Sequence, residues 1–140
     1  MPALKGARLA GPQLHAADLR GKVVVVNFWN QLCPPCQREQ PELEQDWERL
    51  RSRGVLFVGV NYVGQNWPDD PSAARAYLRD FGVTYPTIQD PDTSIARAFG
   101  VEGIPTTIVV GRSGRLRFKR LGAVHEGELD RLVERLTPSR

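Results

Sequence analysis

Three apolar runs rich in β-branched residues recur along the chain, at residues 21–29, 55–62 and 104–110. A run with few polar interruptions is typical of a strand that is covered on both faces. We therefore predict a strand in each run and expect the first two to lie inside a sheet.

Apolar residues at helical spacing follow the first run. Leu43, Trp47 and Leu50 would form the buried stripe of one helix, among glutamate, glutamine, aspartate and arginine residues. Pro41 lies inside this segment and has no NH group, which predicts a kink or break near Gln40.

The second half of the chain repeats the alternation of helix and strand. Asp70 as N-cap and Pro71 at the first helical position predict a helix that Gly82 ends. The remaining expected elements are an extended piece, a small helix, a hairpin strand and a last helix, at residues 85–90, 93–99, 115–120 and 126–136.

This order of elements predicts the class of fold. Parallel strands joined by crossover helices and followed by an antiparallel hairpin form a mixed sheet. We expect an α/β three-layer sandwich (α/β/α) with a central mixed β-sheet, in one domain over residues 1–140. Residues 1–20 contain two glycines and two prolines and would be an irregular N-terminal extension with at most a short strand pair.

Composition narrows the possible functions. The 140 residues are 41% hydrophobic and 25% charged, which is ordinary for a globular protein. The net charge of +3 is spread over single arginines, so nucleic-acid binding is not favoured. No apolar run approaches the roughly 20 residues of a membrane span, and no signal-peptide pattern opens the chain. We expect an intracellular protein, or an exported domain supplied without its leader or anchor.

The chemistry of the sequence centres on Cys33 and Cys36, the only two cysteines. A C-x-x-C pair can be a redox centre, half of a metal site or a structural staple. The staple is disfavoured because so short a loop restricts the unfolded chain little. A structural zinc site needs about four ligands, and only His15 and His125 could add to the pair. Haem attachment needs a histidine where Gln37 stands. Thiol-disulfide exchange is the favoured chemistry.

The position of Cys33 gives a physical reason for reactivity. It would follow the carboxyl end of a central strand and cap a helix, whose N-terminus stabilises a thiolate. We expect an accessible attacking Cys33 thiolate and a sheltered Cys36 that resolves the mixed disulfide. Pro34 and Pro35 have no NH group, which leaves the Cys36 NH as the near donor. Cys33 should therefore be only moderately acidic and the pair poised toward reduction.

Several motifs in order resemble a known family. The segments "VVVVNFW", "CPPC", "GVEGIPTT" and "GRSGRLRFKRLG" are similar to the thioredoxin-like superfamily, specifically its TlpA/ResA-like (DsbE/CcmG-like) branch, over about residues 4–136. That branch includes cytochrome c maturation reductases. The resemblance implies a thioredoxin-like fold and an extracytoplasmic monomer without a cofactor. It also implies that protein disulfides are the substrates. An upstream thiol donor would reduce the protein again, and a membrane dithiol carrier is a candidate for it.

The resemblance also assigns roles to single residues. Pro105 would be a cis-proline facing the cysteines, Ile104 would offer its backbone to an extended substrate, and Trp29 would line the active-site surface. From the residues alone, Pro105 could equally be a strand-entry proline and Trp29 a packing residue. Leu32 stands where the branch often has tryptophan.

A proton acceptor for Cys36 is harder to find. Asn27 replaces the buried aspartate of thioredoxins, and Gln65 stands near the place of a glutamate in the branch. Neither amide can carry a proton in exchange. Glu102 could approach the site, although a solvated loop carboxylate is the more favoured interpretation.

Other functions remain open at this point. A peroxide-reducing thioredoxin-like protein is disfavoured because Asn30, not threonine, lies three residues before Cys33. A soft-metal (copper) chaperone could use Cys33 and Cys36, but Met1 is the only methionine and thioether ligands are otherwise missing. A cytoplasmic location is the alternative to an extracytoplasmic one.

Overall fold

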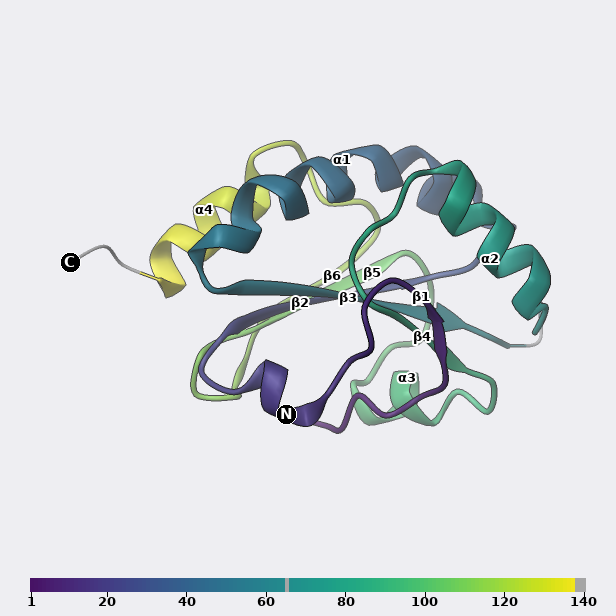
Figure 1. Ribbon diagram of the computed structural model, residues 1–140, viewed down its shortest axis with the longest axis horizontal. Helices are drawn as coiled ribbons and strands as arrows, with labels where there is room; N and C mark the ends of the chain where they lie inside the picture. Colours follow the sequence, from purple (N-terminus) through teal and green to yellow (C-terminus); the bar gives the residue numbers. More distant parts are fainter. Residues whose placement is uncertain (65, 138–140) are drawn as a thin grey trace.

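A mixed sheet of six strands forms the middle layer of the computed structural model, which describes residues 1–64 and 66–137 (Figure 1). The strand order is β1-β4-β3-β2-β5-β6. The strands are β1 (Arg8–Ala10), β2 (Val23–Trp29), β3 (Val55–Tyr62), β4 (Thr87–Asp90), β5 (Thr106–Val110) and β6 (Leu116–Leu121). Strands β2, β3 and β4 are parallel, whereas β1, β5 and β6 pair antiparallel with their neighbours.

Helices cover both faces of this sheet (Figure 1). They are α1 (Pro34–Leu50), α2 (Pro71–Asp80), α3 (Ser94–Ala98), α4 (Glu128–Leu136) and the short 3₁₀ turns η1 (Ala16–Leu19) and η2 (Arg51–Arg53). Helices α1, α2 and α4 lie on one face, and α3 and η1 lie on the other. The predicted three-layer α/β/α sandwich is confirmed. Within the described residues, no helix combines the length and the apolar character needed to cross a bilayer.

Strand β2 is the centre of the molecule, as its sequence predicts. All seven of its residues are buried, and it pairs with β3 in parallel and with β5 antiparallel. The carboxyl ends of β2 and β3 therefore lie at the same edge of the sheet, where open α/β sheets place their ligand sites. The loop that follows Trp29 at this edge ends in Cys33, and Cys36 lies in the first turn of α1.

The prediction of a break near Gln40 is wrong, whereas a kink there stays a prediction. The helix continues through Pro41 from Pro34 to Leu50 and ends in η2, followed by Gly54 at a positive φ of 76°. The side chain of Pro41 is exposed, so the Gln37 carbonyl that loses its NH partner lies toward water and can be hydrated.

The N-terminal 20 residues are more than an irregular extension. Strand β1 pairs antiparallel with β4, with Arg8 opposite Ile88, and so adds a strand to the edge of the main sheet. Leu4 and Leu9 are buried. This pairing joins segments far apart in sequence, which local patterns cannot predict.

Candidate active site

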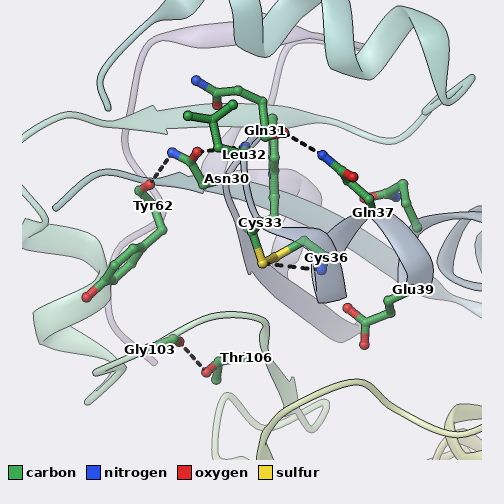
Figure 2. The surroundings of a disulfide bond; sticks show 12 residues. Asn30, Gln31, Leu32, Cys33, Cys36, Gln37, Glu39, Tyr62, Gly103 and Thr106 are labelled. Carbon is green, nitrogen blue, oxygen red and sulfur yellow. Dashed lines mark hydrogen bonds between the residues drawn. A yellow bond between two sulfur atoms is a disulfide. The ribbon is translucent and has the colours of Figure 1, made fainter. Parts of the chain in front are cut away.

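Cys33 and Cys36 form a disulfide at the N-terminus of α1 (Figure 2). Cys33 is the N-cap residue, and its Sγ accepts a hydrogen bond from the Cys36 NH at 3.2 Å. Pro34 and Pro35 fill the first two helical positions and supply no NH donor. The cap predicted from the sequence, with Cys36 as its near donor, is confirmed.

The loop before the disulfide is held by the side chain of Asn30. Its Nδ2 donates to the carbonyl oxygens of Tyr62 at 2.9 Å and Pro68 at 3.2 Å, and its Oδ1 accepts from the Leu32 NH at 3.0 Å. Asn30 is fully buried. These bonds fix the loop before Cys33 against the end of β3 and the segment that follows it, and Figure 2 shows the bond to Tyr62.

Both cysteines are buried in the disulfide form, each with 1% of its surface exposed. The expectation of an accessible Cys33 thiolate concerns the reduced form, so it stays a prediction. The buried residues of the surrounding cluster are Leu9, Trp29, Ala74, Tyr77 and Leu78, with Trp67 and Ile104 partly buried against them. A thiol can reach either sulfur only after a neighbouring side chain moves.

Trp29 lies inside this cluster and does not line the surface. Its side chain is 1% exposed and stacks on Tyr77, with ring centroids 4.7 Å apart. The Tyr77 hydroxyl lies within hydrogen-bonding distance of the Cys36 carbonyl oxygen, at 3.4 Å, and of Gln40 Oε1, at 3.3 Å. Trp29 is therefore a packing residue that supports the first turn of α1 through Tyr77.

The Ile104–Pro105 peptide bond is cis, which confirms the conformation implied by the resemblance. Pro105 is buried, and its carbonyl oxygen accepts from the Gly122 NH at 2.7 Å. Ile104 is half-buried and packs against the cluster that contains both cysteines. The structure thus brings this loop to the disulfide, and Figure 2 shows Gly103 and Thr106 on the side of the site opposite Leu32.

Glu39 is a candidate functional residue that the sequence interpretation missed. It lies one turn of α1 after Cys36 (Figure 2) and is only 4% exposed. Its Oε1 accepts from Asn27 Nδ2 at 3.2 Å, and its Oε2 accepts from the Val124 NH at 2.8 Å. Burial raises the pKa of Glu39 to about 7, although these hydrogen bonds oppose the shift.

A signal for Glu39 was present in the sequence. The residue lies three positions after Cys36 and four before Leu43, so it continues the buried stripe of the helix. Glutamate on such a stripe is uncommon and points to a special environment.

Glu102, the earlier candidate for proton transfer, is exposed. Its exposure fits the solvated loop carboxylate that the sequence favours, and a part for Glu102 in proton transfer stays a prediction. Gln65 lies outside the described residues. Among the described residues, no group of three or more His, Cys, Asp or Glu side chains could hold a metal ion. His15 and His125 are both exposed.

The model of the AhpC/TSA family matches residues 1–119, most of the chain. The chain belongs to the AhpC/TSA family.

Curated relatives define the branch of this AhpC/TSA protein. It is 32% identical over 106 residues to the thiol-disulfide oxidoreductase ResA of Bacillus subtilis, covering 76% of this chain and 56% of that protein. It is 34% identical over 122 residues to the thiol:disulfide interchange protein HelX of Rhodobacter capsulatus, covering 86% of this chain and 64% of that protein. The chain thus spans less than two thirds of these two relatives.

Solved structures agree with this assignment. A thiol-disulfide isomerase from Corynebacterium glutamicum superposes with a TM-score of 0.87 at 27% identity, covering 99% of this chain and 97% of that one. DsbF from MTB gives a TM-score of 0.81 at 30% identity, covering 94% of this chain and 93% of that one. The thioredoxin-like fold and the TlpA/ResA-like resemblance are confirmed. With its Cys33–Cys36 pair, this AhpC/TSA protein is a thiol-disulfide oxidoreductase.

Proposed function

We propose that the protein reduces disulfide bonds in other proteins, with exported proteins such as apocytochrome c as candidate substrates. The observation that carries the proposal is the place of Cys33, which caps α1 but accepts only from the Cys36 NH because Pro34 and Pro35 follow it. A thiolate with little stabilisation belongs to a pair that gives up electrons readily.

The first step is an attack by the Cys33 thiolate on one sulfur of the substrate disulfide. A bond forms between Cys33 Sγ and that sulfur, the substrate S–S bond breaks, and the other substrate sulfur leaves as a thiolate that takes a proton. The product is a mixed disulfide. The positive end of the α1 dipole and the Cys36 NH favour the attacking thiolate.

The second step is an attack by Cys36 on the Cys33 sulfur. The Cys33–Cys36 disulfide forms, the mixed disulfide breaks, and the second substrate thiol is released, so two electrons pass from the pair to the substrate. Cys36 must first lose its proton, and Glu39 on the next turn of α1 is our candidate acceptor. A pKa of about 7 suits a group that takes and returns a proton near neutral pH.

Substrate docking is proposed at the rim of the same site. The half-buried Ile104 would pair its backbone with an extended substrate beside Pro105. Leu32 is 59% exposed next to Cys33 and supplies an apolar contact there. The proposal includes an extracytoplasmic monomer whose disulfide is reduced again by an upstream dithiol, with a membrane carrier as the candidate donor.

Two measurements test the proposal. The reduction potential of the Cys33/Cys36 pair should lie well below the roughly −120 mV of a strong periplasmic oxidant. The wild-type protein should also reduce insulin with dithiothreitol as donor, and Cys33→Ser should lose that activity, whereas Cys36→Ser should accumulate a mixed disulfide through Cys33. Undiminished turnover by Cys33→Ser would end the mechanism. Tight Cu(I) binding without insulin reduction would favour the copper chaperone. Turnover of peroxide would favour the peroxide-reducing protein.

A further inference from the structure

A pocket of about 660 Å³ lies on the sheet face that carries η1, whereas the redox pair lies at the start of α1 on the other face. Val24, near the start of β2, and Val110, at the end of β5, both line it. The cysteines instead follow Trp29, five residues further along β2, a separation of about 17 Å at the rise of a strand. Ile88 also lines the pocket and pairs with Val60 near the other end of the sheet, so it is the sheet itself that separates the pocket from the redox pair. Neither cysteine is among the lining residues.

Three segments that are distant in sequence contribute to this pocket. They are residues 1–6, residues 14–16 and 19–22 in and around η1, and the β5–β6 turn at 110–114. Its larger apolar lining residues are Met1, Leu4, Leu14, Leu19, Val24, Ile88 and Val110. Such a volume falls in the range of small-molecule sites, which are lined mainly by apolar side chains.

The charged side chains that line the pocket are all basic. Lys5, Arg20, Lys22 and Arg112 line it, and none of the lining residues is an aspartate or glutamate. Among the described residues, none of these four side chains has a salt bridge or hydrogen bond. Four unpaired cations around an apolar hollow are complementary to a ligand with a hydrocarbon body and one negative group.

We propose that this pocket binds a small amphiphilic anion of the fatty-acid type. The aliphatic chain would lie on the apolar residues, and the carboxylate would meet the basic rim, where charge-assisted hydrogen bonds to lysine and arginine are the strong kind. Arg49 and Arg120 show the contrast, because each of them pairs with carboxylates of its own chain. The site is separate from the proposed disulfide reduction.

The first test is an NMR titration of the full chain with dodecanoate below its micelle concentration, beside dodecan-1-ol and dodecylamine as ligands of equal length. Dodecanoate should shift the amide signals of the lining residues Gly21, Gly111 and Gly114. It should bind about tenfold or more tightly than either control, because only the carboxylate can make charge-assisted hydrogen bonds to the basic rim. A tenfold difference corresponds to about 1.4 kcal/mol. No saturable shift, or equal binding of all three, would overturn the proposal.

Two pairs of variants locate the site. Ala16→Trp should fill the pocket and weaken dodecanoate binding about tenfold or more, whereas Ala17→Trp, in the same η1 turn but outside the lining, should not. Lys22→Ala/Arg112→Ala should weaken binding similarly, and Arg75→Ala/Arg79→Ala on α2 should leave it unchanged. The charge variants decide the matter if Ala16→Trp does not fold. Affinity unchanged by the loss of both charges would contradict an anion site.

Discussion

Asn27 donates its Nδ2 to Glu39 Oε1 at 3.2 Å and so joins the central strand β2 to the helix that carries the redox pair. The same Nδ2 lies 3.1 Å from Thr107 Oγ1 on β5, and the second oxygen of Glu39 accepts from the Val124 NH. All of these partners are neutral. The carboxyl is thus well hydrogen-bonded but has no compensating charge among them, which is why desolvation dominates and raises its pKa to about 7.

The first prediction concerns stability against pH. Because the pKa of Glu39 rises from 4.5 in the unfolded chain to about 7 in the folded one, the folded state binds more protons in this window, and stability must fall as pH rises through it. Glu39→Gln removes this dependence. We expect the free energy of unfolding of the variant, relative to that of the wild type, to increase by up to about 3 kcal/mol when the pH is raised from 4.5 to 7 or above. Urea denaturation of both proteins at each pH measures this difference.

The glutamine can be accommodated without a lost hydrogen bond. The Oε1 of the glutamine can accept from the Val124 NH. If the Asn27 side-chain amide flips, its Oδ1 takes the place of Nδ2 and can accept from the Nε2 of the glutamine. The same Oδ1 can then accept from the Thr107 hydroxyl. Glu126→Gln, at an exposed position, is the control and should leave the pH profile unchanged. Parallel profiles for wild type and Glu39→Gln would contradict the raised pKa.

How far the sequence could predict the site depends on the range of the interactions. The Cys33 cap and the two prolines after it are local features, and strand β2 is visible as one apolar run, so these predictions are confirmed. The burial of Trp29 was not predictable in this way, because it depends on Tyr77 from α2 stacking on it. Likewise, Glu39 owes its environment to strands and to the Val124 segment, which the helix pattern alone does not place.

The second prediction concerns the prolines of the CPPC motif. Pro35 is at the second helical position, where an NH would point at the capping Cys33 sulfur. Pro35→Ala should therefore add a donor to the thiolate and lower the pKa of Cys33 by about one unit. Since this stabilises the reduced form, the reduction potential should rise by about 30 mV, measured against glutathione.

Pro34→Ala is the matched control for this effect. The first helical position is not one from which a cap side chain normally accepts, so the pKa of Cys33 should change far less. Thiolate absorbance during a pH titration of the reduced proteins gives the comparison. Equal shifts in the two variants would show that the cap hydrogen bond is not what sets the acidity of Cys33.

The third prediction tests the support beneath the disulfide. Tyr77→Phe keeps the ring that stacks on Trp29 but removes the hydroxyl that contacts the Cys36 carbonyl and Gln40. Burial raises the pKa of Tyr77, so the group lost is a neutral donor. We expect a loss of about 1–2 kcal/mol in the free energy of unfolding, because a buried acceptor loses its partner. Tyr62→Phe is the control, since the Tyr62 hydroxyl makes no hydrogen bond among the described residues, and an equal cost there would sink the argument.

The fourth prediction separates docking from stability at Leu32. This side chain is 59% exposed beside Cys33, so Leu32→Ser removes apolar rim surface but little buried area, and the free energy of unfolding should change by less than about 0.5 kcal/mol. The kcat/KM for a protein disulfide should fall about threefold to tenfold, which corresponds to a lost contact of about 1 kcal/mol. Leu116→Ser is the matched control, because Leu116 is also an exposed leucine, with 44% of its surface accessible. It lies at the start of β6, next to the β5–β6 turn, and this end of the strand is away from the cis-proline loop. A fall in kcat/KM of similar size in both variants would mean that Leu32 has no special part in docking, and a fall confined to Leu32→Ser would place the substrate over the rim next to Cys33.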